Sequence, residues 1–142
     1  MTNYQKHDIG MLSNLDQHVF APEELPVRLE GKVFLKEILG LTSMEVSVNK
    51  DAPGTGINFF HRHKNNEETY IFFSGTGEMI IDDEHINVKE GTVVRIKPDA
   101  KRAWWNTGKE DLYYIVIQAP SDGLVGSTLT DGELIEGSVP WS

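Results

Sequence analysis

The sequence predicts an all-β protein, a sandwich or barrel of short strands. Runs of β-branched, aromatic and alternating apolar residues recur between residues 41 and 120. Clusters of Gly, Pro, Asn and Asp separate these runs at short, regular intervals, and no long helix is indicated between them. Many short strands with regular turn signals are typical of sandwiches and barrels rather than of folds that alternate strands with helices.

Four strands are expected in the first half of this region. Residues 44–48 alternate apolar and polar side chains, as a half-buried strand does, and a turn cluster rich in Pro and Gly follows them. Residues 57–63 are the second candidate. Residues 69–73 are the third, because they are rich in β-branched and aromatic types. A Ser-Gly-Thr-Gly turn then leads into residues 78–81.

Four further strands complete the series. A polar Asp-Asp-Glu hairpin tip separates residues 78–81 from residues 86–88. Residues 92–96, 102–105 and 112–117 follow, and they are punctuated by a glycine, a Pro-Asp pair and an Asn-Thr-Gly turn. We therefore expect one compact β unit over residues 41–120.

The segments on either side of this unit are less regular. Residues 1–40 form an N-terminal arm with little regular structure, apart from residues 33–40, which predict either a short helix ended by Gly40 or a first strand. Residues 121–142 are rich in Gly, Ser and acidic types but keep several apolar residues, Trp141 among them. We expect this C-terminal tail to pack on the barrel or on a partner subunit.

Length and composition exclude several classes of protein. The 142 residues fit one domain, and no stretch approaches the ~18 consecutive apolar residues of a membrane span. The formal net charge of −9 disfavours a nucleic acid partner. There is no cysteine, and residues 1–7 lack the pattern of a signal peptide. We expect a cytoplasmic protein with neither a membrane nor a nucleic acid as partner.

One cluster of residue types indicates a metal site. His61 and His63 are two residues apart, so they point to the same side only on an extended strand. Glu68 arrives from the next expected strand. Two imidazoles and a carboxylate are a ligand set for divalent transition metals.

The spacing of these residues resembles the first motif of the cupin superfamily, in which a His-x-His run is followed by Glu and then by Gly. His61, His63, Glu68 and Gly75 stand at those positions. The resemblance, to a small single-domain cupin, covers about residues 41–120. It implies a double-stranded β-helix, a jelly-roll barrel, with the site inside its mouth.

The second cupin motif is matched at its two ends, by Gly91 and Asn106. Within it, Lys97 replaces the expected Pro and Asp99 the expected Gly. Arg102 stands where metal-binding cupins have a His as the fourth ligand. A guanidinium offers donors only and stays protonated, so Arg102 cannot bind a metal.

Strand parity assigns a set of side chains to the cavity that this resemblance implies. Core packing is the preferred role for Tyr70 and Trp104, ahead of stacking on a substrate. The expected metal ligands are His61, His63 and Glu68, and the expected ligand-binding residues are Arg102, Tyr70, Trp104, Phe59 and Phe72.

Three functional interpretations follow. In the first, His61, His63 and Glu68 hold Fe, Mn, Ni or Zn, and Arg102 clamps a small anionic substrate of a dioxygenase-, isomerase- or decarboxylase-like enzyme. In the second, no metal is bound, Arg102 pairs with Glu68, and the histidines hydrogen-bond a small ligand. In the third, the cavity is filled by side chains and the protein has a structural or regulatory role. Whether the chain is an enzyme stays open at this point.

A homodimer is also expected. Cupins that resemble this chain commonly pair through sheet edges and terminal arms, and the exposed edge of an open sheet needs covering.

Overall fold

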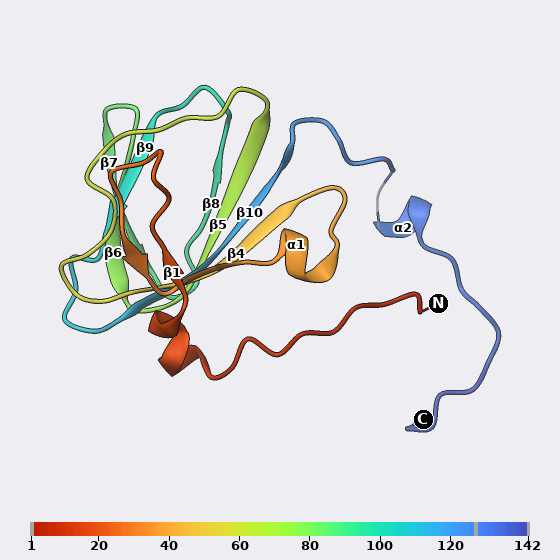
Figure 1. The fold of residues 1–142 in the computed structure, drawn as a ribbon. Coiled ribbons are helices and arrows are strands. Elements are labelled where there is room, and N and C mark those ends of the chain that lie inside the picture. The colour runs from red at the N-terminus through yellow and green to blue at the C-terminus, as the bar shows by residue number, and fades with distance from the viewer. Residues whose placement is uncertain (1, 127, 142) are drawn as a thin grey trace.

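Two antiparallel sheets face each other around the core of the protein (Figure 1). The structure is a computed structural model that describes residues 2–126 and 128–141. It is mostly β with little helix, as the sequence predicts, and the paired sheets form the double-stranded β-helix of a jelly roll. No helix of the described part of the chain is long and apolar enough to cross a membrane.

Eight strands make up the two sheets. The larger sheet has the order β3-β4-β10-β5-β8 and the smaller has the order β7-β6-β9. The bounds are β3 (Lys32–Phe34), β4 (Glu45–Asp51), β5 (Asn66–Ser74), β6 (Thr76–Ile81), β7 (Glu84–Lys89), β8 (Val93–Ile96), β9 (Arg102–Trp105) and β10 (Leu112–Pro120). The long strand β10 pairs with both β4 and β5 and so lies at the centre of the larger sheet.

Seven of the eight predicted strands are present as β4 to β10, and residues 57–63 are the exception. The backbone here pairs with β9 through two isolated bridges, Gly56–Trp105 just before the segment and His61–Arg102 within it. A bend at Phe59 lies between the bridges and interrupts the ladder. The segment nevertheless continues the smaller sheet beyond β9, with alternate side chains directed inward.

The N-terminal arm contains more regular structure than expected. Residues 33–40 hold parts of both predicted elements, because β3 is followed by a single helical turn that ends at Gly40 in the left-handed conformation, with φ 68°. The remaining short elements are η1 (Leu12–Gln17), β1 (Val19–Phe20), β2 (Leu29–Glu30), α1 (Lys36–Leu39) and, in the tail, α2 (Thr128–Asp131).

Strand β4 directs its polar face into the barrel. Ser47, Asn49 and Asp51 are all buried there. An alternating strand normally turns its apolar face to the core. Here the outer face is covered as well, since Leu15 of η1 packs against Val48 of β4. The covered outer face leaves the inner face free to carry polar groups next to a cavity.

The C-terminal tail extends away from the barrel (Figure 1). The sequence analysis expects the tail to pack either on the barrel or on a partner subunit. The apolar side chains of the tail are almost fully exposed in the single chain, so they do not pack on the barrel. Packing on a partner subunit stays a prediction. The exposed residues are Leu124, Val125, Leu129, Leu134, Ile135 and Trp141.

Candidate metal centre and cavity

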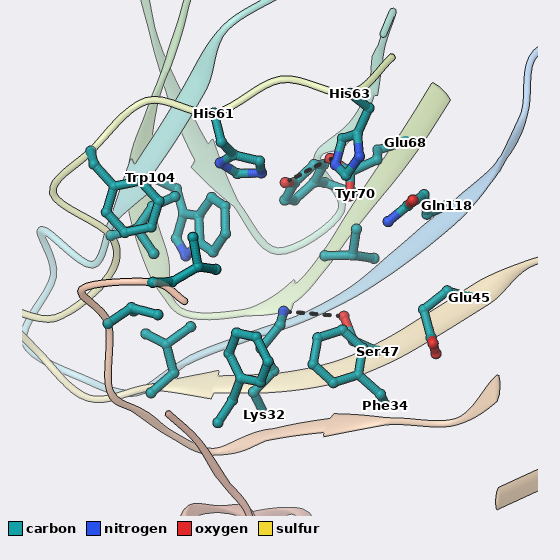
Figure 2. A pocket seen from close by; sticks show the side chains of 17 residues that line it. Lys32, Phe34, Glu45, Ser47, His61, His63, Glu68, Tyr70, Trp104 and Gln118 are labelled. Carbon is teal, nitrogen blue, oxygen red and sulfur yellow. Dashed lines mark hydrogen bonds and ion pairs between the residues drawn. The ribbon is translucent and has the colours of Figure 1, made fainter. Parts of the chain in front are cut away.

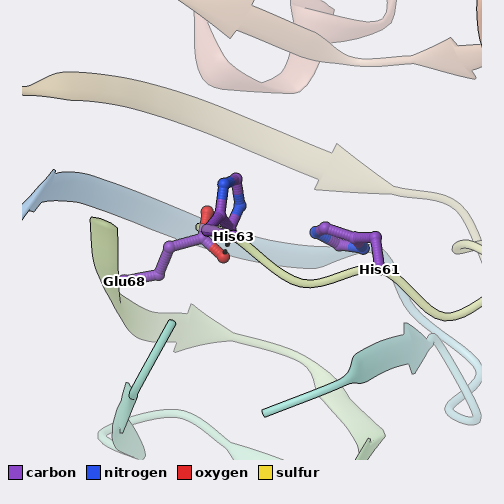
Figure 3. A group of neighbouring side chains, drawn as sticks. All are labelled: His61, His63 and Glu68. Atoms are coloured by element: carbon purple, nitrogen blue, oxygen red, sulfur yellow. Dashed lines mark ion pairs between the residues drawn. The ribbon is translucent and has the colours of Figure 1, made fainter. Parts of the chain in front are cut away.

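Two side chains from residues 57–63 and one from β5 form the candidate metal site. His61 exchanges two backbone hydrogen bonds with Arg102 of β9, at 3.2 and 3.0 Å. The backbone N–H of His63 donates to the carbonyl of Pro98 at 3.0 Å. These bonds fix the segment against the smaller sheet, so that both imidazoles face Glu68 and the barrel interior (Figure 3).

The three side chains fit a divalent metal ion. Their ligand atoms all lie within 4.8 Å of one another. A zinc ion lies about 2.0–2.2 Å from such atoms, and its tetrahedral ligands are ~3.3–3.6 Å apart, so the set needs to close by roughly 1–1.5 Å. Nδ1 of His61 and Nε2 of His63 are buried without a hydrogen-bond partner among the described residues. Buried polar atoms are nearly always paired, and a metal ion would satisfy these.

The charge state of His61 suits metal binding. Burial, followed by the positive charges of Arg102, His63 and Lys32, lowers the pKa of His61 from 6.5 to about 4. The ring is therefore neutral near pH 7. Only a neutral imidazole has a nitrogen lone pair to offer to a metal ion.

Glu68 is buried and is oriented by its neighbours. The Tyr70 hydroxyl donates to Oε1 of Glu68 at 3.3 Å, and Nε2 of His63 lies 3.4 Å from the same oxygen. Burial, and next the negative charge of Glu68, raise the pKa of Tyr70 well above 10, so the hydroxyl keeps its proton. Tyr70 thus acts as a fixed donor that turns the carboxylate toward the histidines.

The structure places Arg102 behind the cavity wall and not among the lining residues, so a direct clamp on a substrate stays a prediction. The side chain is fully buried. Its Nη2 donates to the carbonyl of Lys97 at 2.9 Å, and its Nη1 lies 3.8 Å from Oε1 of Glu68. Arg102 is not among the residues that line the cavity, because the side chain runs toward the loop that follows β8.

A cavity of about 310 Å³ opens in front of the candidate metal site (Figure 2). Its wall is mainly apolar, and part of it comes from the N-terminal arm, which the sequence analysis did not place there. The apolar residues are Phe20, Leu25, Val27, Leu29, Phe34, Ile57, Phe59, Tyr70, Trp104 and Val116, and the polar ones are Lys32, Glu45, Ser47, His61, His63, Glu68 and Gln118.

The five residues predicted to bind a ligand divide into two groups. Phe59, Tyr70 and Trp104 line the cavity. Phe72 packs in the core behind Tyr70, with the two rings stacked at 6.3 Å between centroids, and does not line the cavity. Phe72 and Arg102 face the barrel interior as parity predicts, but other side chains separate them from the cavity.

Lys32 is the polar cavity residue that sequence reasoning missed. Its Nζ donates to Oδ1 of Asn49 at 2.7 Å and to Oγ of Ser47 at 3.3 Å, and it lies 5.0 Å from the centroid of the Phe34 ring. The residue begins β3, directly before residues 33–40, for which the sequence analysis predicts either a helix or a strand and assigns no inward face. The signal that could have located it is the polar face of β4, because Lys32 pairs across the strands with Asn49.

A buried carboxylate supports the aromatic wall. Oδ2 of Asp51 accepts hydrogen bonds from Nε1 of Trp104 at 3.1 Å and from the hydroxyl of Tyr114 at 2.9 Å. Burial raises the pKa of Asp51 to about 6, although these two hydrogen bonds and the charge of Lys32 oppose the shift. Asp51 thereby fixes the orientation of Trp104, which forms one side of the cavity.

Solved structures of known proteins share this fold. A crystal structure of a cupin protein from Bacteroides fragilis is 34% identical, with a TM-score of 0.80 over 96% of this chain and 100% of that chain. A predicted oxalate decarboxylase from Thermotoga maritima is 22% identical, with a TM-score of 0.58 over 66% of this chain and 82% of that one. A putative sugar phosphate isomerase from Acidithiobacillus ferrooxidans is 23% identical, with a TM-score of 0.57 over 65% and 60% of the two chains.

The sequence comparison points to the same family. A comparison with curated proteins gave no match. The cupin domain family matches residues 48–118, which is half of the chain and contains the candidate metal ligands. With the fold and the likeness to the Bacteroides protein, this match shows that the chain belongs to the cupin family.

Proposed function

We propose that the protein is a metal-dependent enzyme that acts on a small molecule held in the barrel cavity. The observation that carries this proposal is the convergence of His61, His63 and Glu68. Two buried imidazole nitrogens there have no hydrogen-bond partner among the described residues, and one of them lies 3.4 Å from Oε1 of Glu68. The metal would be Fe, Mn, Ni or Zn, bound by these three side chains. When bound, it would supply Lewis-acid or oxygen chemistry at the inner end of the cavity.

The chain's own residues would prepare the site for this chemistry. His61 stays neutral because it is buried beside Arg102, and Tyr70 holds the carboxylate of Glu68 in place by a hydrogen bond. The mainly apolar wall would lower the local dielectric constant, which strengthens polar interactions inside the cavity. The predicted decarboxylase and the putative isomerase among the solved structures are less than 25% identical, so they support the fold and do not identify the reaction.

A second candidate function is metal-free binding of a small ligand. The observation that favours it is the approach of Arg102 to Glu68, with 3.8 Å between Nη1 and Oε1. In that case the pair would offset two buried charges, and the histidines would hydrogen-bond the ligand. The two candidates differ in whether the purified protein holds a metal.

Metal analysis of the purified, untagged protein after growth with added Fe, Mn, Ni and Zn distinguishes them. We expect about one metal ion per chain, and we expect His61→Ala to lose it, because two ligands hold a metal far more weakly than three. His85→Ala is the matched control, since His85 also pairs with a carboxylate, Glu78, at 2.9 Å, but on the surface. Sub-stoichiometric metal in the parent protein, unchanged in His61→Ala, would contradict the proposal.

A further inference from the structure

The cavity contains a second polar site opposite the candidate metal ligands. Lys32 enters from β3 in the larger sheet, whereas His61 and His63 lie across the cavity from it (Figure 2). Its ammonium group donates one hydrogen bond to Asn49 and one to Ser47. An ammonium has three N–H donors, so a third is left for a molecule in the cavity.

The acceptors that position Lys32 are themselves fixed. Asn49 and Ser47 are buried, with 1% and 3% of their surface exposed. Nδ2 of Asn49 donates to Oγ of Ser47 at 3.0 Å and to the carbonyl of Tyr114 at 3.3 Å. These bonds turn the amide oxygen of Asn49 toward Lys32. The ammonium is thus held in a built polar network, unlike a lysine on the surface.

Lys32 lacks a direct counter-ion within the described part of the chain. No carboxylate of those residues lies within 4.0 Å of its nitrogen, and Asp51, Glu68 and Glu45 attract it only from longer range. A charge taken out of water without a paired partner is destabilising. Burial accordingly lowers the pKa of Lys32 to about 8, which leaves most of the amine protonated near pH 7.

The surroundings of Lys32 define the anion that would complete the site. The cavity that holds the lysine and the histidines is lined mainly by apolar side chains, including Phe20, Leu29, Phe59 and Trp104. The cavity volume of about 310 Å³ corresponds to on the order of ten water molecules, which limits the ligand to a small one. One ammonium faces the carboxylates of Glu45 and Glu68 in the same cavity, so a second negative charge on the ligand would be repelled.

We propose that Lys32 anchors the carboxylate of a small monocarboxylic acid whose apolar body fills the cavity. The inference rests on the cavity of the proposed function and names its substrate class. It does not require the metal, because the lysine and its acceptors are formed by β3 and β4 alone. The carboxylate would take the third N–H of the ammonium, and the other end of the ligand would face the histidines.

Calorimetric titration of the full-length, chelator-treated protein tests the proposal without the metal. The probes are benzoate, its neutral isostere benzamide and the dianion phthalate. We expect benzoate to bind saturably at millimolar concentrations and to bind roughly 10- to 100-fold more tightly than benzamide, as for other buried charge pairs. Phthalate is expected to bind more weakly than benzoate.

Two variants of Lys32 test whether this residue causes the preference for benzoate over benzamide. Lys32→Met removes the charge and keeps the length of the side chain. It should weaken the binding of benzoate roughly 10- to 100-fold and leave the affinity for benzamide nearly unchanged. Lys32→Gln keeps an N–H donor for Asn49, so it preserves the polar network if the methionine variant unfolds. Lys89→Met, at an exposed position on β7, is the control and should bind benzoate as the parent does.

The outcomes separate this inference from the proposed metal function. Benzoate binding that is lost in folded Lys32→Met or Lys32→Gln, and kept in Lys89→Met, supports the anchor whether or not a metal is found. Equal binding of benzoate and benzamide would overturn it, as would unchanged benzoate affinity in either folded lysine variant or an absence of saturable benzoate binding.

Discussion

At the scale of single residues, the buried carboxyl group of Asp51 makes the stability of the protein depend on pH. Its pKa is raised by burial from 3.8 to about 6 in the folded protein. Between those pH values the folded state binds a proton that the unfolded state has released. Stability therefore falls as pH rises through this window and then levels off. A shift of about two units corresponds to ~3 kcal/mol at most.

Asp51→Asn tests this effect. The amide cannot ionise, so the difference in unfolding free energy between variant and parent should grow in favour of the variant from about pH 4 to about pH 6. Urea denaturation across this range measures it. Glu84→Gln, on an exposed carboxylate of β7, is the control and should show no such trend. A difference that is constant with pH would show that Asp51 keeps its ordinary acidity.

The sequence located the metal-ligand candidates but not their polar surroundings. His61, His63 and Glu68 could be placed together because alternation on an extended segment is a local rule. Lys32 could not, because its position opposite the histidines depends on the pairing of β3 with β4. Arg102 was placed on the correct face, but parity does not say how deep a long side chain reaches or what covers it.

At the scale of elements, two turn glycines, Gly75 and Gly91, differ in how closely the rest of the protein packs around them. Gly75 joins β5 to β6 with φ 89°, and Gly91 precedes β8 with φ 87°. A Cβ atom on Gly75 would lie 2.5 Å from the carbonyl oxygen of Asp111, whereas one on Gly91 would meet no atom within 4 Å. The two glycines share a conformation and differ in the space around them.

Alanine at these two positions should therefore separate strain from steric overlap. Gly91→Ala should cost about 1 kcal/mol, from the left-handed conformation alone. Gly75→Ala should cost at least ~2 kcal/mol, because the backbone of β10 must also shift. Chemical denaturation of both variants gives the comparison. Equal losses of stability would contradict the steric explanation.

Strand prediction succeeded where alternation and turn chemistry agree, as in β9 and β10, and was wrong for residues 57–63. The ladder there is interrupted at Phe59, and no pattern in the sequence marks such a bend. The polar inner face of β4 is a related case. Its alternation is clear in the sequence, but the covering of the opposite face by η1 comes from packing between distant segments.

The exposed tail raises the question of assembly at the scale of the whole molecule. Trp141 is 83% exposed and Leu134 is fully exposed in the single chain. Large apolar side chains gathered on one segment of a protein mark an interaction site. We propose that the tail packs on a second copy of the chain, which would cover these residues in a homodimer.

Light scattering at micromolar concentration should report a dimer. A triple substitution in the tail, Leu134→Ser, Ile135→Ser and Trp141→Ser, should shift the protein to a monomer without unfolding the barrel, because these side chains are exposed in the single chain. Phe60→Ser, at an exposed position outside the tail, should leave the dimer intact. A monomeric parent protein would refute the prediction.

The residues that shape the cavity and the residues that carry its reactive groups come partly from different segments of the chain. Phe20, Leu25, Val27 and Leu29 belong to the arm and shape the cavity, whereas His61, His63 and Glu68 belong to the cupin domain and carry its reactive groups. If the proposed function holds, the arm would contribute to the size limit for a bound molecule, and the chemistry would come from a separate stretch of the chain. Exchange of residues 20–29 between related proteins would alter size selectivity while every barrel strand stayed the same.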